Sequence, residues 1–255
     1  MNIKFILIAC ISAISLFTLK AQEAVNKKIE WSMGVGFNIG ATAPLSVPQE
    51  VRSIDLYSPN VNPNLRLNAI YNFDEKWGAG IGLQYETKGM RVKSQVKHMY
   101  INFVPVGGDP KTDNLEGYFV GKNSSEISNS YLTIPIYATY RISNKWRLKG
   151  GCYFSNTLKS KFTGSVSDGY LRIYSPVGDK QIIDFEEFDF SEDVRDYDIG
   201  FILDAEYKLT NRISITGGLS WGMMPIFYSE RSPMQFKMRN YYGAFGISYL
   251  LGFFN

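Results

Sequence analysis

The most constraining feature of this sequence is a pattern of alternating apolar residues that occurs eight times between Ile29 and Phe253. In a β-strand, residues i, i+2 and i+4 share one face, so each repeat predicts a strand with one apolar and one polar face. The breaks between repeats alternate between long polar-rich segments and turns of three or four residues. Because lipid leaves no room for an open sheet edge, this combination predicts a closed, up-and-down β-barrel that crosses a membrane.

The phase of the pattern locates each expected strand. In the first, Trp31, Met33 and Val35 share one face, opposite Ser32 and Gly34. The expected strands cover residues 31–40, 65–73, 77–86, 131–142, 146–154, 197–208, 213–221 and 244–253. The fold class that follows is all-β: an eight-stranded antiparallel transmembrane barrel with short periplasmic turns and long extracellular loops.

Two orientations of the apolar face are possible. A membrane barrel turns it outward to lipid, whereas a soluble lipocalin-like carrier turns it inward to a ligand cavity. Aromatic residues recur at the strand ends beside the short turns, as an interfacial belt requires. These residues are Phe73, Trp77, Tyr140, Trp146 and Tyr207. The short turns also fall at one end and the long connections at the other, which favours the outer membrane of a Gram-negative cell envelope.

The first residues resemble a secretory signal. Lys4 precedes an apolar core, Phe5 to Leu19, and a plausible cleavage site follows Ala21. We therefore expect a signal peptide over residues 1–21 and a barrel domain over residues 22–255. A lipoprotein-type site at Cys10 is the alternative, but it would leave the apolar run from Ile11 to Leu19 after the cut.

The charge of the mature chain excludes some classes of partner. Without Lys4 and Lys20, 25 of the 27 basic residues remain against 24 acidic ones. This balance does not indicate nucleic acid as a partner. Cys152 is then the remaining cysteine, so no intrachain disulfide is expected, and its apolar phase predicts a buried or lipid-facing, inert thiol.

Four long connections join the expected strands, at residues 42–63, 91–130, 159–195 and 225–237. The basic residues at the start of the second are Lys88, Arg91, Lys93 and Lys97. The acidic residues at the end of the third are Asp184, Glu186, Glu187, Asp189, Glu192, Asp193, Asp196 and Asp198. A divalent-cation site is one interpretation of the acidic run, but the spacing matches no fixed loop. We favour a solvated segment, paired with the basic one or folded as a hairpin above the membrane.

Charged residues also occur in the inward phase of the expected strands. They are Arg66, Glu86, Arg141, Arg147, Lys149, Asp204, Glu206 and Lys208. A charge in a narrow lumen must be paired or hydrated. Because Arg147 and Lys149 lie on the strand next to Asp204 and Glu206, we expect cross-strand pairs that fill the lumen. Conduction of ions through this network is the alternative.

The sequence contains few groups suited to catalysis. His98 is the single histidine and lies in a long connection, with no serine and carboxylate grouped around it in the sequence. No phosphate-binding loop or Cys/His metal motif is present. We therefore assign no catalytic, cofactor-binding or metal-binding residues and expect no enzymatic activity.

One strand carries a family resemblance. Residues 130–140, Ser-Tyr-Leu-Thr-Ile-Pro-Ile-Tyr-Ala-Thr-Tyr, resemble the "YLxIPxxxxY" strand of PorT-type, porin-like outer-membrane β-barrel proteins. The resemblance extends over residues 29–254, although the chain ends Phe253-Phe254-Asn255 rather than on the terminal aromatic of the usual assembly signal. It implies a small integral barrel of the outer membrane, and a minority of relatives act with a protein-secretion apparatus. It transfers no catalytic or ligand-binding residues.

These observations favour a barrel with a structural or interaction role. The expected partners are outer-membrane lipid, the barrel-assembly machinery during insertion, and a protein or polysaccharide at the extracellular loops. A narrow pore or secretion-apparatus component, a lipid-modifying enzyme and a lipocalin-like carrier are the alternatives. Single-channel conductance distinguishes the pore, and loss of activity in His98→Ala distinguishes the enzyme.

Overall fold

The computed structural model describes residues 29–173, 175–228 and 232–254, so the expected signal peptide lies outside the described residues. The strands are β1 (Ile29–Ala43), β2 (Val51–Pro59), β3 (Pro63–Asn72), β4 (Trp77–Phe103), β5 (Leu115–Arg141), β6 (Trp146–Lys159), β7 (Phe162–Ile173), β8 (Lys180–Asp189), β9 (Tyr197–Lys208), β10 (Ile213–Gly222) and β11 (Arg239–Phe254). A 3₁₀ turn, Ser191–Asp193, precedes β9. Over the described ranges, no helix has the length and apolarity needed to cross a membrane.

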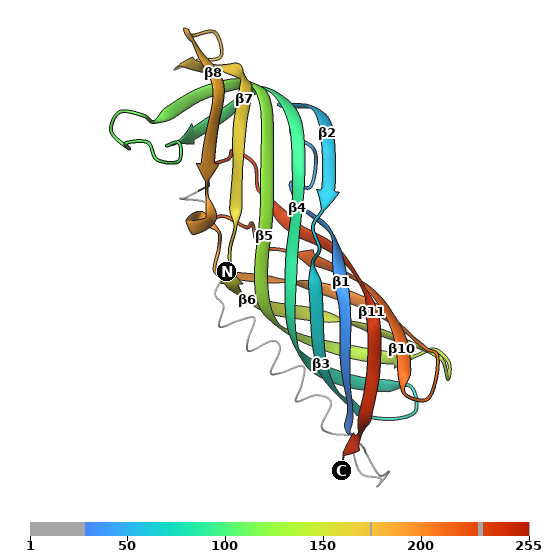
Figure 1. Ribbon diagram of the computed structural model, residues 1–255. Helices are drawn as coiled ribbons and strands as arrows, with labels where there is room; N and C mark the ends of the chain where they lie inside the picture. Colours follow the sequence, from blue (N-terminus) through green and yellow to red (C-terminus); the bar gives the residue numbers. More distant parts are fainter. Residues whose placement is uncertain (1–28, 174, 229–231, 255) are drawn as a thin grey trace.

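Eight of the strands close a ring, as the sequence predicts. Their order is β4-β3-β1-β11-β10-β9-β6-β5, and the pairing of β5 with β4 closes the ring (Figure 1). All of these pairings are antiparallel. The eight-stranded, up-and-down barrel is therefore confirmed, and β9 has the same bounds as the expected strand over residues 197–208.

The three short turns share one hydrogen-bonding device. In each, the side-chain oxygen of the second turn residue accepts two hydrogen bonds. The donors are the backbone N–H groups of the last turn residue and of the first residue of the next strand. Asp74 Oδ1 accepts from Lys76 and Trp77, both at 2.7 Å. Ser143 Oγ and Thr210 Oγ1 do the same in their turns. Short polar side chains of this kind stabilise tight turns, which explains the Asp, Ser and Thr at these positions.

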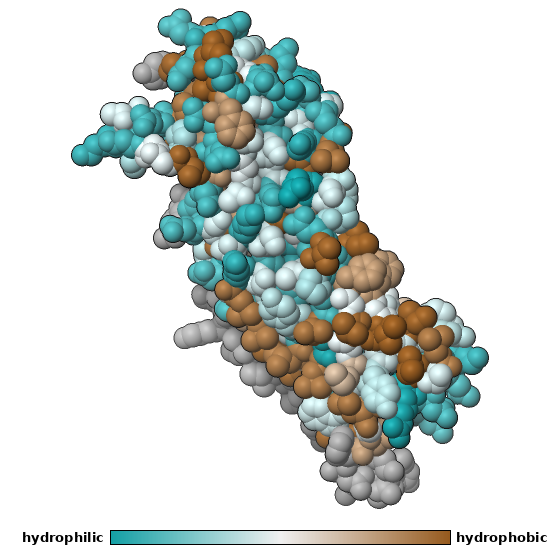
Figure 2. All heavy atoms as spheres, viewed as in Figure 1, coloured by the Kyte–Doolittle hydropathy of each residue, from teal (hydrophilic) through white to brown (hydrophobic). Residues whose placement is uncertain are grey.

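The outward face of the ring is apolar (Figure 2), and the residues that face inward are polar. On β1, Met33, Val35 and Phe37 are about half exposed, whereas Ser32 and Asn38 are buried. The expected aromatic belt forms beside the short turns, where Trp77 contacts Tyr140 and Trp146 contacts Tyr207 at ring distances of 4.7 and 4.9 Å. The lipocalin-like alternative is wrong, because the apolar side chains lie outside the ring. The thiol of Cys152 is exposed on the same outward face.

The long connections contain strands, and treating residues 91–130 and 159–195 as loops was wrong. β4 and β5 each have 27 residues and pair over most of their length, from Trp77 opposite Tyr140 to Phe103 opposite Leu115. At about 3.3 Å per residue, each strand is roughly 90 Å long. A strand needs only about 9–11 residues to cross a membrane, so β4 and β5 extend well beyond it. Above the ring, β2 pairs with β4 and β7 pairs with β5, followed by β8. We call the upper parts of β4 and β5, together with β2, β7 and β8, the extracellular sheet.

The polarity of β4 inverts where it leaves the barrel. Within the ring, its outward residues Ile81 and Leu83 are apolar and exposed, whereas Glu86 is buried inside. Farther up, Lys93 is exposed on the outward side and Val96 is buried on the inward side. The lower part of the strand is thus suited to lipid and the upper part to water. A sequence search for outward apolar residues finds only the lower part.

β-Bulges change the phase of strands in the extracellular sheet, and at two of them a residue has a positive φ. His98 (φ 58°) is an extra residue in β4, and Asp168 (φ 49°) lies at a similar irregularity in β7. Before the bulge in β4 the even-numbered Val96 is buried, and after it the odd-numbered Met99 is buried. A single inserted residue exchanges the two faces of a strand, so the simple alternation breaks there.

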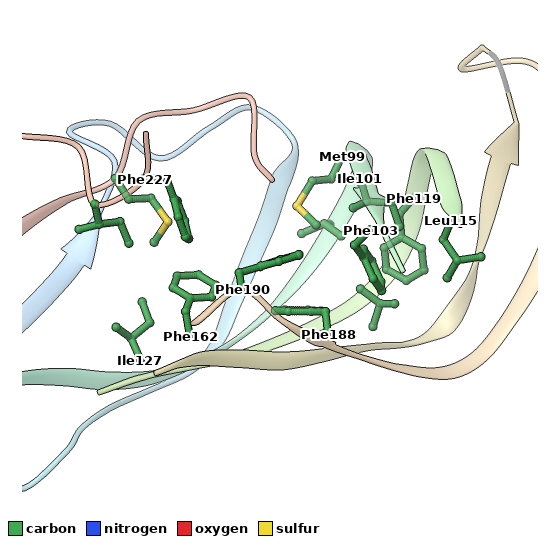
Figure 3. Close-up of a cluster of buried hydrophobic side chains, with 14 of the residues drawn as sticks. Met99, Ile101, Phe103, Leu115, Phe119, Ile127, Phe162, Phe188, Phe190 and Phe227 are labelled. Atoms are coloured by element: carbon green, nitrogen blue, oxygen red, sulfur yellow. The ribbon is translucent and has the colours of Figure 1, made fainter. Parts of the chain in front are cut away.

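The extracellular sheet has its own apolar core (Figure 3). The side chains of Phe162 and Phe227 are in edge contact at 5.0 Å, and Phe188 stacks on Phe190 at 4.8 Å. Its buried members are Met90, Val96, Met99, Ile101, Phe103, Leu115, Phe119, Ile127, Phe162, Val166, Leu171, Ile183, Phe188, Phe190, Val194, Ile226, Phe227 and Met238. The connection between β10 and β11 therefore contributes to this core as well as the strands.

Candidate functional site

The lower lumen contains a network of charged side chains from β1, β6 and β9. Arg147 donates two hydrogen bonds to the carboxylate of Glu30, at 2.6 and 2.8 Å. Lys149 Nζ lies 2.8 Å from Glu206 Oε2, and Arg147 lies 3.9 Å from the same carboxylate. The register places Arg147 opposite Glu206 and Lys149 opposite Asp204. The structure thus brings together three of the residues selected from the sequence, and it adds Glu30.

Asp204 and Arg66 form a contact across the lumen rather than between neighbouring strands. Arg66 Nη1 lies 3.7 Å from Asp204 Oδ2, and both side chains are largely buried. β3 and β9 are not neighbours in the ring, so the pair depends on the way in which the barrel closes. The Asp204 side chain also packs where a Cβ on Gly218 would stand, which explains the glycine on the adjacent strand.

A second polar cluster lies higher in the lumen, around Glu86 and Lys88. Glu86 accepts hydrogen bonds from Asn38 Nδ2 at 3.1 Å and Thr133 Oγ1 at 2.8 Å. Lys88 Nζ is 3.3 Å from Glu86 and lies near the rings of Tyr131 and Tyr153, at 5.2 and 4.8 Å. Lys88 is fully buried, so its assignment to a basic loop was wrong. An ammonium can be held in such a place by one carboxylate and two aromatic faces.

Arg141 and Lys208 lie away from these clusters, at the short-turn end. Arg141 Nη1 donates to the backbone oxygen of Glu75 at 2.8 Å. Lys208 ends β9 and is exposed. Neither side chain forms an ion pair with a described residue.

Three lumen residues were not selected from the sequence. Glu30 lies one residue and Lys88 two residues outside an expected strand, in the inward phase of Ser32 and Glu86, so an extension of the pattern would have found them. Asp198 was counted with the acidic run. It points inward instead, where Tyr153 Oη and Asn240 Nδ2 donate to it at 2.9 and 3.0 Å.

The free space inside the ring is small. Two lumen cavities have volumes of about 20 Å³ each, one beside Arg66 and Tyr137 and the other beside Glu86 and Tyr153. A cavity of about 10–15 Å³ holds a single water molecule. Tyr137 contributes to the filling because its ring occupies the position that a side chain on Gly80 would take, and its hydroxyl donates to Asn68 at 3.0 Å.

His98 lies on the surface of the extracellular sheet. Its side chain is exposed at the bulge in β4, and no described serine or carboxylate is hydrogen-bonded to it. Its left-handed backbone conformation forms the bulge at which the two faces of β4 exchange, which is a structural role. Within the described ranges, no group of three or more histidine, cysteine or acidic side chains is arranged to hold a metal ion.

The acidic and basic segments lie on strands of the extracellular sheet that are not neighbours. The order β2-β4-β5-β7-β8 separates the basic residues of β4 from the acidic residues of β8 by two strands. The suggested pairing of these segments is therefore wrong, whereas the suggested hairpin is formed by β7 and β8. Arg91 pairs instead with Glu126 at 2.9 Å, and Lys161 joins the same carboxylate at 2.8 Å. These hydrogen bonds lower the pKa of Glu126.

The edge strand β8 carries exposed apolar side chains among its acids. Ile182 and Phe185 are 69% and 57% exposed, and Val106 beside them is 61% exposed. Val106 is fixed to β8 because its N–H donates to Glu187 O at 3.0 Å. Exposed apolar residues far above the membrane band are candidates for contact with a partner.

Comparison with solved structures gives barrels of low similarity. The attachment invasion locus protein Ail of Yersinia pestis, in complex with the heparin analogue sucrose octasulfate, is 10% identical with a TM-score of 0.36, covering 89% of this chain and 100% of that one. The toluene transporter TbuX of Ralstonia pickettii is 8% identical with a TM-score of 0.24, covering 89% and 90%. No curated protein matches the chain.

The sequence profile of the family described as "Outer membrane protein beta-barrel domain" matches residues 20–228. This range contains seven of the eight ring strands in full. The lipid-suited band and the closed ring are those expected of such a protein. The chain therefore belongs to the outer membrane protein β-barrel domain family and is a protein of the cell outer membrane.

Proposed function

We propose that the barrel is a membrane anchor that presents the extracellular sheet to a protein or polysaccharide partner. The observation that carries the proposal is the apolar core of the sheet, in which eighteen side chains are buried above the membrane band. A core of this size holds a surface in one conformation, and a preformed surface binds with less loss of conformational entropy. Mobile loops would not provide it.

We further propose that the lumen is closed to solutes. The two polar clusters occupy it at successive heights, and the two cavities of about 20 Å³ between their side chains have room for about one water molecule each. The larger cavity at the short-turn end reaches only as far as the lower cluster. Eight strands leave an interior only just wide enough for side chains. A closed lumen suits an anchor better than a narrow pore.

The exposed strand β8 is the proposed contact surface. Ile182 and Phe185 would pack against the partner as the apolar centre of the interface. The surrounding carboxylates would form its polar rim, as in other protein interfaces; they are Asp184, Glu187 and Asp189. Apart from Glu187, whose backbone oxygen accepts from Val106, the outer edge of β8 also offers backbone groups to an extended segment of the partner.

Photo-crosslinking in living cells tests this surface. A photoreactive residue at Phe185 should give a discrete crosslinked species, and the same residue at Lys111, in the exposed turn between β4 and β5, should not. A second substitution, Ile182→Glu, should abolish the species at position 185. Equal crosslinking at both positions, or none at 185, would contradict the proposed surface.

Planar-bilayer recording tests the closed lumen. The folded protein should give no conductance steps, whereas a variant that empties the upper cluster, Tyr131→Ala with Tyr153→Ala, should give small ones. Steps in the unmodified protein would support the pore instead.

The proposal assigns no catalytic step to this chain. His98 is the extra residue of the bulge in β4. Its imidazole is exposed and has no hydrogen bond to a serine or an acid within the described structure. A lipid-modifying activity would need these groups together near the membrane surface.

Within the family, we propose that the chain belongs to the PorT-type group. The strand that carries the resemblance has a structural explanation: Tyr131 covers Lys88, Tyr140 packs on Trp77, and Pro135 lacks an N–H for the ladder. The pairing of β4 with β5 is indeed interrupted opposite Pro135, between Ile81 and Gln84. A role with a secretion apparatus would make a component of that apparatus the crosslinked partner.

A further inference from the structure

The short-turn end of the barrel opens into a vestibule that the proposed function does not use. Its cavity has a volume of about 460 Å³, within the range of small-molecule sites. The turns between β5 and β6 and between β9 and β10 form one side of it. The ion pair of Arg147 and Glu30 forms its inner end.

The charges around this vestibule are not balanced. Of the residues that the structure describes, five cations and two carboxylates line it: Arg141, Lys145, Arg147, Lys208 and Arg212, with Glu30 and Glu206. Both carboxylates are already occupied, because Arg147 binds Glu30 and Lys149 binds Glu206. The positive charge that remains belongs to side chains nearer the mouth.

Among the described residues, Lys145 and Lys208 are the two lining cations whose side chains form neither a hydrogen bond nor an ion pair, whereas Arg141 and Arg212 donate hydrogen bonds. Neither ammonium group forms an ion pair with any residue that the structure describes. Their turns lie side by side, because the backbone N–H of Lys208 donates to the oxygen of Lys145 at 2.8 Å. Arg141, on the neighbouring strand end, uses Nη1 for the Glu75 carbonyl and retains other N–H groups.

We propose that the vestibule binds an anionic oxygen group, phosphate or carboxylate, of a molecule on the periplasmic side. Lys145 and Lys208 hold the anion, and Arg141 supplies further donors. A concave site lined by one sign of charge concentrates counter-ions, and an ammonium offers three donors to such oxygens. Trp146 and Phe253 also line the rim of the cavity.

Isothermal titration with inorganic pyrophosphate tests the site in the complete mature protein, held in nanodiscs of neutral phosphatidylcholine at low salt. The variant Lys145→Gln with Lys208→Gln should weaken binding by about tenfold or more. The matched control Lys93→Gln with Lys97→Gln removes two exposed lysines from the extracellular sheet and should leave binding unchanged. Heat-modifiable gel mobility establishes that all samples are folded.

The proposal is overturned if the vestibule variant binds pyrophosphate as tightly as the unmodified protein, or if the control loses as much affinity. A further titration separates the two sources of the anion. If a lipid head group of the inner leaflet is the natural occupant, phosphatidylglycerol in the nanodisc should compete with pyrophosphate, and this effect should be absent in the vestibule variant. If phosphatidylglycerol does not compete, the occupant is a soluble phosphate or carboxylate.

Discussion

His98 adopts a left-handed backbone conformation, with φ at 58°, in the bulge that exchanges the faces of β4. This conformation costs an L-residue roughly 1–2 kcal/mol, and a β-branched side chain is the least suited to it. His98→Gly should therefore keep or raise the free energy of unfolding of the extracellular sheet, and His98→Val should lower it by about 1–2 kcal/mol. Urea unfolding of the detergent-folded protein measures both.

The matched control for His98 is Gln95, an exposed residue in the regular part of the same strand. There the order should reverse, because glycine costs about 0.5–1 kcal/mol in a strand and valine suits it. The same order of stability at both positions would mean that the bulge does not determine the effect.

Lys88 is held in the lumen by Glu86 and two tyrosine rings. Lys88→Met should destabilise the barrel by about 3–5 kcal/mol, because it leaves the Glu86 carboxylate buried without its partner. The double variant with Glu86→Gln should recover much of the loss. Unfolding of the three variants in urea forms a double-mutant cycle, and additive losses would show that the two residues do not interact.

Glu126 gives the extracellular sheet a dependence on pH. Hydrogen bonds from Lys161 and Arg91 hold its pKa below the usual 4.5, so it contributes stability above that value and loses it as the pH falls through the folded-state pKa. The group is partly exposed, so the contribution should be under about 1 kcal/mol. Glu126→Gln should flatten the acid limb of sheet stability, measured by proteolysis between neutral and acid pH. An unchanged acid limb would contradict this.

At the scale of elements, the sequence predicts the ring better than the sheet above it. The ring strands keep one apolar face to lipid, so their alternation is regular over most of their length, and the shifts at Trp31 and Ser130 lie near the ends of the ring. In β4 and β5 the apolar face turns inward above the membrane, and the bulges at His98 and Asp168 break the alternation again. The extensions therefore have the composition of polar loops although they are strands.

The sequence likewise predicts some contacts between the lumen charges and not others. Phase alone brings Arg147, Lys149 and Glu206 to one place, because β6 and β9 are neighbours through a regular register. The contact of Arg66 with Asp204 crosses the ring, and local sequence carries no information on such a contact. Lys88 lies just beyond an expected strand end and was therefore counted with the loop.

The core of the extracellular sheet should unfold separately from the ring. Phe162 is fully buried in it, and Phe162→Ala should cost about 3–5 kcal/mol and expose β7 and β8 to protease. The ring, held by its own pairings, should retain heat-modifiable mobility. Val177→Ala, at a position 85% exposed, is the control and should change neither. Loss of the mobility shift in Phe162→Ala would show that sheet and ring fold as one unit.

At the scale of the whole molecule, two regions of opposite polarity share the same long strands. The ring is apolar outside and polar inside, and the extracellular sheet is polar outside and apolar inside. The change occurs on β4 between Tyr85 and Lys93. We infer that this change marks the outer surface of the membrane.

The most direct test is labelling of intact cells with a membrane-impermeant maleimide. The native thiol of Cys152 lies on the lipid-facing side of β6 and should not react, so the unmodified protein is its own control. Lys97→Cys in the extracellular sheet should be labelled from outside, Leu83→Cys should not, and Lys145→Cys should react only after the outer membrane is permeabilised. Labelling of Cys152 or of Leu83→Cys in intact cells, or protection of Lys97→Cys, would contradict the account.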